Sequence, residues 1–273
     1  MRRNPTARLV LLTLAACAAT TACSRLAFIR PDLGRGDFEQ TALDVEVREP
    51  RRGEAQARQL VLHAQQALLS GQTADAERVA REAVRLDDQL ADAHTVLAAA
   101  LDAQAKPAPA GRHYRRAAEL SPQRGGPLNN YGAWLCRNGK PAEALGWFDR
   151  ALADRDYATP AAALANAGFC ADRAGDHARA ERDLRRAIEL DPQNALALGT
   201  LAEREYRAGR YLQARAFSER RLAVAPADRA ALQLASQIEH ALGDNAAAQQ
   251  YVQRMGEESP QPRDSKQGAK NRP

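Results

Sequence analysis

The feature that most restricts this sequence is a period of 34 residues, which runs from Ala57 almost to the C-terminal end. Position 20 of the period is alanine every time, and position 8 is always a small residue. Position 20 is occupied by Ala76, Ala110, Ala144, Ala180, Ala214 and Ala248, and position 8 by Ala64, Ala98, Gly132, Gly168, Ala202 and Ser236. Small side chains are needed where two helices cross at close approach. Each period therefore predicts a pair of packed helices.

Two further positions of the period mark the ends of these helices. Position 15 suits a left-handed turn after a first helix, because it is glycine in all units but one. Its residues are Gly71, Ala105, Gly139, Gly175, Gly209 and Gly243. Position 32 is proline in four units, where it would end the second helix; these residues are Pro122, Pro192, Pro226 and Pro260. The whole pattern is that of the tetratricopeptide (TPR) helix–turn–helix repeat.

The period predicts an all-α fold, a right-handed superhelix of six tandem TPR hairpins that spans residues 57–262. The units are 57–90, 91–124, 125–158, 161–194, 195–228 and 229–262, with an insertion of two residues before the fourth. A single hairpin cannot bury its apolar face, whereas stacked hairpins can, and their first helices then line a concave surface. Aromatic residues make up only 5% of the chain, which agrees with close helix contacts. Pro107 and Pro109 predict that the second helix of unit 2 starts late.

Residues 1–22 have the layout of an export signal. Arg2, Arg3 and Arg8 precede an apolar run of about 21 Å if helical, which is short of the roughly 30 Å needed to span a bilayer. The run ends at Cys23, as in a bacterial lipoprotein signal, so Cys23 is the predicted lipidation site. Cys17 is the alternative, and ordinary cleavage without a lipid also stays open. If the chain is lipidated, Ser24 implies sorting to the outer membrane.

The segments that flank the repeats predict no packed structure. Residues 23–56 carry proline, glycine and mixed charge without a lasting period, so they predict a lipidated N-terminus and a flexible tether. Residues 263–273 offer almost nothing apolar to bury and predict a disordered tail. Without the export signal, 36 basic residues face 34 acidic ones. This balance gives no electrostatic reason to expect nucleic acid as a partner.

The sequence contains none of the common motifs of catalysis or cofactor binding, so we expect a protein that is not an enzyme and has no cofactor or small-molecule substrate. The five histidines are scattered over the units and predict no metal site. Among them, His63 and His94 lie in neighbouring first helices and could approach each other. Cys136 and Cys170 also lie in neighbouring first helices. A disulfide and two free buried thiols are both compatible with the register.

The concave surface is the expected binding site, since positions 2, 5, 9 and 12 of each first helix point into it. The candidate groove residues are Val61, Gln65, Leu68, Asn129, Ala133, Ala165, Phe169 and Tyr206. Few of them are charged, which favours an apolar strand or helix as the guest. For Val61, Leu68 and Phe169, packing between units is the alternative role.

Two stretches of the chain resemble the PilF/PilW family of type IV pilus biogenesis lipoproteins, also called pilotins. They are CSRLAFIRP, from Cys23 to Pro31, and PLNNYGAWLCRNGKPAEALGWFDRAL, from Pro127 to Leu152. The resemblance implies a lipid-anchored protein on the periplasmic face of the outer membrane. It also implies a protein partner, the pilus secretin, whose localisation and multimerisation the family promotes. A periplasmic adaptor for cell-wall hydrolases is the alternative function.

Overall fold

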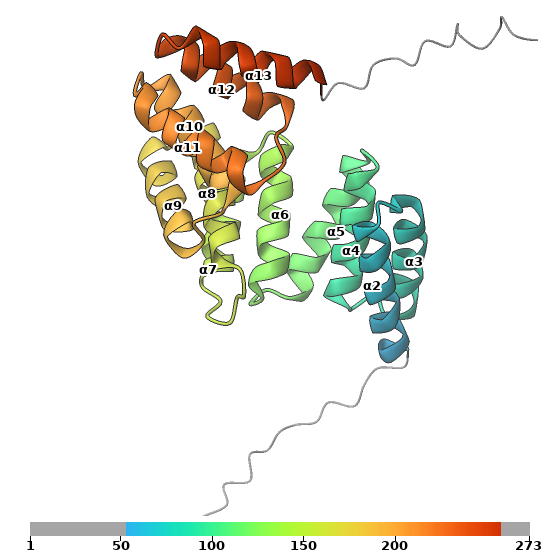
Figure 1. Ribbon diagram of the computed structural model, residues 1–273. Coiled ribbons are helices and arrows are strands. Elements are labelled where there is room, and N and C mark those ends of the chain that lie inside the picture. Colours follow the sequence, from blue (N-terminus) through green and yellow to red (C-terminus); the bar gives the residue numbers. More distant parts are fainter. Residues whose placement is uncertain (1–52, 258–273) are drawn as a thin grey trace, which may run out of the picture. The chain divides into compact units, whose positions relative to one another are not determined.

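The computed structural model describes residues 53–257, which form twelve helices and no strand (Figure 1). The helices are α2 (Glu54–Leu69), α3 (Thr73–Leu86), α4 (Ala91–Ala103), α5 (Pro107–Leu120), α6 (Gly125–Arg137), α7 (Pro141–Leu152), α8 (Pro160–Ala174), α9 (His177–Leu190), α10 (Ala195–Arg207), α11 (Tyr211–Val224), α12 (Arg229–Ala241) and α13 (Asn245–Glu257). The predicted signal peptide, Cys17, Cys23, almost all of the tether and the tail lie outside the described residues.

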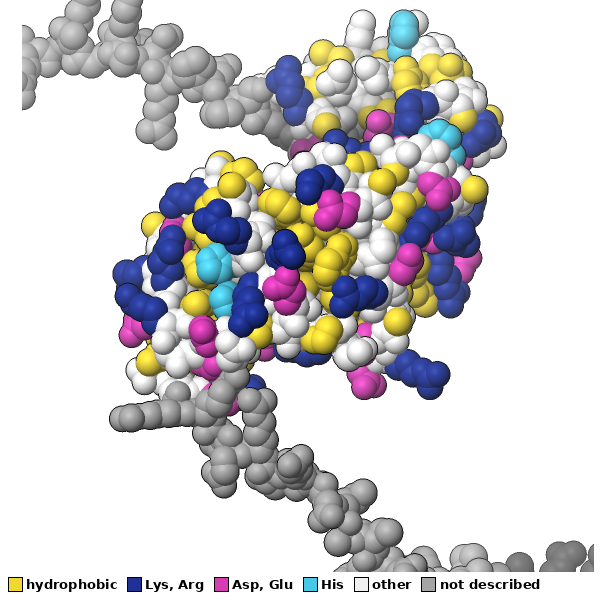
Figure 2. All heavy atoms as spheres, turned by 180° about the vertical axis from the view of Figure 1, so that it is seen from behind, with side chains coloured by type: hydrophobic (Ala, Val, Ile, Leu, Met, Phe, Trp, Pro, Cys, Tyr) yellow, Lys and Arg dark blue, Asp and Glu magenta, His cyan; other side chains and the backbone are white. Residues whose placement is uncertain are grey.

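The helices stack in chain order, as the predicted all-α TPR superhelix requires. Each helix packs on the next one along the chain, and the first helices of successive units (α2, α4, α6, α8, α10 and α12) also contact one another. Within the described range, no helix combines the length and the apolar character that a membrane crossing demands. On the face seen in Figure 2, basic and acidic side chains are interspersed among apolar ones. The described residues also include ion pairs between side chains four residues apart on one helix, such as Arg81 with Glu77 and Arg58 with Glu54.

Position 8 of the repeat is small because a bulky side chain from the second helix lies directly against it. A Cβ atom added to Gly132 would lie 2.9 Å from the ring of Phe148, and one added to Gly168 would lie 2.6 Å from Cγ of Leu184. Phe148 and Leu184 both occupy position 24 and are completely buried. The small residue at position 8 therefore makes room for the large residue at position 24 of the same hairpin.

The prediction of a late start for the second helix of unit 2 was wrong. Helix α5 begins at Pro107, which is position 17 of the unit, and the other five second helices begin at the same position. The first N–H groups of a helix have no partner within it, so Pro107 at the first position and Pro109 at the third remove no helical hydrogen bond. At the other end of the repeats, α2 begins at Glu54, three residues before the predicted start at Ala57.

All six turn residues at position 15 have positive φ, and Ala105 is the one that is not glycine, with φ of 56°. A left-handed conformation costs an alanine about 1 kcal/mol relative to its right-handed form. We expect Ala105→Gly to raise the free energy of unfolding by about 0.5 to 1 kcal/mol, since the added freedom of the unfolded chain offsets part of the gain. Urea unfolding followed by circular dichroism would measure the change.

Gly139 provides the reverse control, because it has φ of 81° and nothing within 4 Å of an added Cβ. Gly139→Ala should therefore lower the stability by about 1 kcal/mol through conformation alone. Equal stability of the wild type and both variants would contradict this explanation of the turn position.

Candidate protein-binding groove

A groove of about 740 Å³ lies over the C-terminal half of the repeats, on helices α8, α10, α11 and α12. Its apolar wall is made by Phe169, Leu196, Tyr206 and Leu234, and its amide and charged groups include those of Gln233, Gln237, Glu203, Arg207 and Arg221. Leu196 is 39% exposed, so its side chain is open to a guest. A hollow with an apolar wall and a few polar groups is a candidate binding site.

Eight lining residues come from positions 2, 5, 9 and 12 of the first helices, the positions that the sequence pattern singles out. They are Phe169, Leu196, Gly199, Glu203, Tyr206, Ala230, Gln233 and Gln237. The groove therefore lies on the side of α8, α10 and α12 that carries these four positions. Of the individual candidates, Phe169 and Tyr206 line this hollow.

The other candidates lie outside this hollow, and Val61, Ala165 and Asn129 are buried. Val61 is 5% exposed and belongs to the core of the first units, while Ala165 is 1% exposed and packs in a cluster with Leu184 and Leu201. Their placement on an open groove surface was wrong, because both are short side chains at position 5 that the neighbouring helices cover. Gln65 is exposed, and Leu68 and Ala133 are half-buried, so all three stay candidates.

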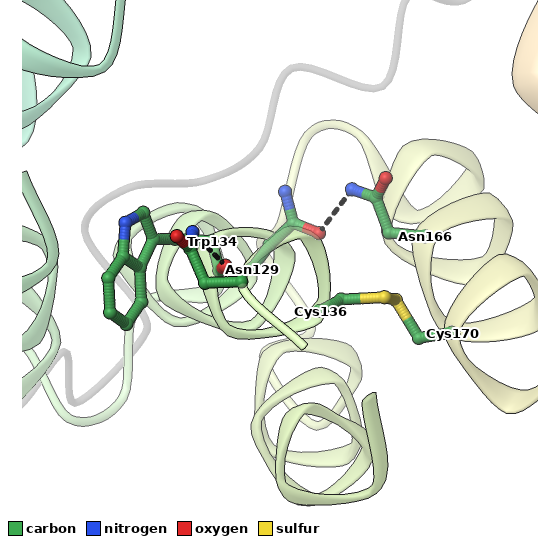
Figure 3. Close-up of a disulfide and its surroundings, with 6 residues drawn as sticks. Asn129, Trp134, Cys136, Asn166 and Cys170 are labelled. Carbon is green, nitrogen blue, oxygen red and sulfur yellow. Dashed lines mark hydrogen bonds between the residues drawn. A yellow bond between two sulfur atoms is a disulfide. The ribbon is translucent and has the colours of Figure 1, made fainter. Parts of the chain in front are cut away.

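Asn129 lies where helices α6 and α8 meet, and Figure 3 shows it facing Asn166. Asn166 Nδ2 donates a hydrogen bond to Asn129 Oδ1 at 3.0 Å. The same two helices are joined by a disulfide between Cys136 and Cys170, whose Cα atoms are 5.8 Å apart. Of the two states that the sequence left open for these cysteines, the structure contains the disulfide. Unit 3 is thus tied to unit 4 by a covalent bond and an amide pair.

Next to the groove lies a smaller hollow of about 330 Å³, lined by His177, Arg204, Arg207, Ala208 and Arg210. Arg207 lines both hollows, so they adjoin. Two carboxylates orient the arginines: the half-buried Asp172 accepts hydrogen bonds from Arg204 and Arg207, and the buried Glu205 accepts one from Arg210. Burial acts to raise the pKa of Asp172, but the hydrogen bonds from Arg207 and Arg204 outweigh it, so the pKa lies below its usual value.

Sequence reasoning missed this arginine-lined hollow, because its residues occupy positions 10, 13, 14, 16 and 17, which are not among the positions 2, 5, 9 and 12 that the pattern singles out. The signal that could have found it is the spacing of three arginines at intervals of three residues, with Arg204 and Arg207 at the end of α10 and Arg210 just before α11.

The histidine contact in the structure differs from the predicted one. His94 pairs with His113, with 2.9 Å between the two Nδ1 atoms, while His63 lies 4.0 Å from a carboxylate oxygen of Asp75. Burial lowers the pKa of both paired rings, that of His113 to about 4. The pair lies inside the hairpin of unit 2, because position 4 of its first helix meets its own second helix. Among the described residues, no cluster of three or more metal-ligating side chains occurs.

Comparison with known proteins finds similarity to a repeat family and to type IV pilus proteins. A profile of the tetratricopeptide repeat matches residues 125–193. The type IV pilus assembly protein PilF of Pseudomonas aeruginosa (strain PAO1) is 29% identical over 144 residues, which cover 51% of this chain and 57% of that protein. The match thus spans little more than half the length of this curated relative.

Two solved structures resemble the chain over most of the repeats. The crystal structure of PilW, described as a widely conserved type IV pilus biogenesis factor, has a TM-score of 0.67 and 28% identity, and covers 76% of this chain and 95% of that one. A structure of Pseudomonas aeruginosa PilF has a TM-score of 0.66 and 23% identity, with coverage of 77% and 95%. The latter likeness concerns the fold alone.

The stacked hairpins and the groove define the chain as a tetratricopeptide repeat protein, a class of scaffolds that typically bind other proteins. Within this class it is similar to the type IV pilus biogenesis proteins PilW and PilF.

Proposed function

We propose that this protein is an outer-membrane lipoprotein that acts as a pilotin, an assembly factor for the secretin of the type IV pilus. The observation that carries the proposal is the combined likeness to PilF and PilW, which extends over nearly all of the PilW structure. In this proposal Cys23 carries the lipid, the repeats face the periplasm, and the protein works by binding and not by catalysis. Acyl chains contribute about 0.8 kcal/mol for each buried methylene, so a lipidated Cys23 would hold the protein on the membrane.

The groove over units 4 to 6 is the surface that we assign to the secretin subunit. Its wall of Phe169, Leu196, Tyr206 and Leu234 can bury apolar side chains of a guest, and its amides and charges can fix the guest's orientation. Binding there would hold a subunit beside the membrane where it must assemble.

The anchor is tested by replacing each candidate cysteine. We expect Cys23→Ser to move the protein from the membrane fraction to the soluble periplasm, whereas Cys17→Ser should leave it on the membrane. Fractionation with immunoblotting measures both, and blue native electrophoresis of the same cells should show fewer secretin multimers with Cys23→Ser. If Cys17→Ser releases the protein and Cys23→Ser does not, the lipid is on Cys17. If neither variant releases the protein, the lipoprotein assignment is contradicted.

The groove is tested with a matched pair of exposed leucines. Leu196 lies in the groove and Leu212 lies on the second helix of the same unit, 67% exposed. Leu196→Glu should reduce retention of the purified secretin subunit at least tenfold in a pull-down, since a carboxylate replaces an apolar contact, and Leu212→Glu should leave retention unchanged. Equal retention by both variants would rule out the groove. Retention of a cell-wall hydrolase in place of the secretin subunit would favour the adaptor function.

A further inference from the structure

The amide pair of Asn129 and Asn166 leaves one hydrogen-bonding group unused on each side chain. Asn129 Oδ1 and Asn166 Nδ2 bond to each other, so Asn129 Nδ2 remains as a donor and Asn166 Oδ1 as an acceptor. In Figure 3 both of these atoms point to the same side, away from the disulfide. Rotating both amides by half a turn would exchange their roles and still leave a donor beside an acceptor.

The acceptor of this pair lies one helical turn from a residue of the groove wall. Asn166 precedes Phe169 by three residues on α8, so the two side chains share a face of the helix, and Phe169 lines the groove. Asn129 is 8% exposed, yet its Nδ2 atom is not among the fully buried unpaired polar atoms of the described residues. The amide therefore reaches the surface and can contact a guest.

We propose that Asn129 and Asn166 form a recognition point for the main chain of an extended segment of the partner. In an extended strand, the N–H and C=O of one residue point to the same side, so they can bond to Asn166 Oδ1 and Asn129 Nδ2 together. A helical guest offers no such pair, because its main-chain groups bond within the helix. The partner's identity as the secretin subunit rests on the proposed function, whereas its extended conformation follows from the amide pair.

The disulfide gives this recognition point its fixed geometry. Cys136 lies two helical turns after Asn129 on α6, and Cys170 lies one turn after Asn166 on α8. The covalent bond thus keeps the two helices from sliding past each other, and the spacing of donor and acceptor is set before the guest arrives. Such preorganisation reduces the entropy lost on binding.

The test uses overlapping synthetic peptides that together span the secretin subunit, with binding to the full chain measured by fluorescence anisotropy. Asn129→Asp retains an oxygen that accepts the bond from Asn166 but replaces the outward donor with an acceptor. We expect this variant to bind the captured peptide about tenfold more weakly at an unchanged melting temperature. Gln213→Glu makes the same change of charge on an exposed residue of α11 and should bind like the wild type.

A second measurement needs no change in the protein. Methylating the backbone nitrogens of the captured peptide one at a time removes one N–H donor per peptide, and we expect one central position to lose about tenfold in affinity. Wild-type affinity for Asn129→Asp together with a flat methylation scan would overturn the inference, as would a bound peptide that is helical by circular dichroism. A wild-type chain that captures no secretin peptide would instead contradict the proposed function.

Discussion

Replacing Cys136 and Cys170 together with alanine should lower the free energy of unfolding by about 3 to 4 kcal/mol. The disulfide joins residues that are 34 apart in sequence, and without it the unfolded chain gains the freedom of a loop of that length. Each helix contacts mainly its neighbours, so the loss should appear first as an opening between units 3 and 4. Urea unfolding followed by circular dichroism measures the total, and hydrogen exchange of α6 and α8 locates it.

Reducing the disulfide in the wild type distinguishes the stability contributed by the covalent bond from the effect of replacing the cysteine side chains. A reducing agent should shift the wild-type unfolding midpoint to nearly that of the double variant and leave the double variant unmoved. If the reduced wild type unfolds at the same urea concentration as the oxidised one, the covalent bond contributes no stability.

Phe148→Ala should destabilise the protein by about 3 to 5 kcal/mol, because it empties a completely buried site in the centre of unit 3. The ring fills the space that Gly132 leaves at the crossing of α6 and α7, 2.9 Å from where a Cβ atom would stand. The phenyl group is too large for the backbone to collapse around its absence. Unfolding in urea at fixed pH would measure the loss.

A double-mutant cycle measures whether the effects of Gly132 and Phe148 on stability depend on each other. Gly132→Ala alone should destabilise, because its methyl group meets the ring of Phe148. Combined with Phe148→Ala, the same methyl group enters the emptied space, so its cost should vanish or change sign. Additive losses would mean that position 8 is small for a reason other than the ring.

The repeat could be recognised from sequence because its defining positions describe contacts within one hairpin. The small residue at position 8, the turn residue at position 15 and the start of the second helix depend on residues fewer than 34 apart, so one period carries its own constraints. The prediction for Pro107 was wrong although it concerned a single hairpin. Proline is tolerated in the first turn of a helix, so Pro107 can begin the second helix and does not delay it.

The binding site was harder to predict from the sequence, because it depends on how neighbouring units pack on one another. Phe169 and Tyr206 line the groove as position rules predict, but Val61 obeys the same rules and is covered by adjacent helices. Asn166 was overlooked since position 6 is not concave by rule, although its amide reaches the partner helix. Pairings such as Cys136 with Cys170 likewise need the distance between two units, which a period alone does not supply.

The place of the disulfide along the stack has a mechanical consequence. The disulfide joins unit 3 to unit 4, at the middle of the six hairpins, and the groove lies wholly in units 4 to 6. A pull between a guest in the groove and the N-terminal end of the repeats must pass from unit 4 to unit 3, and the covalent bond bridges that junction. Under such a load, two neighbouring units that no disulfide joins would separate before units 3 and 4 do.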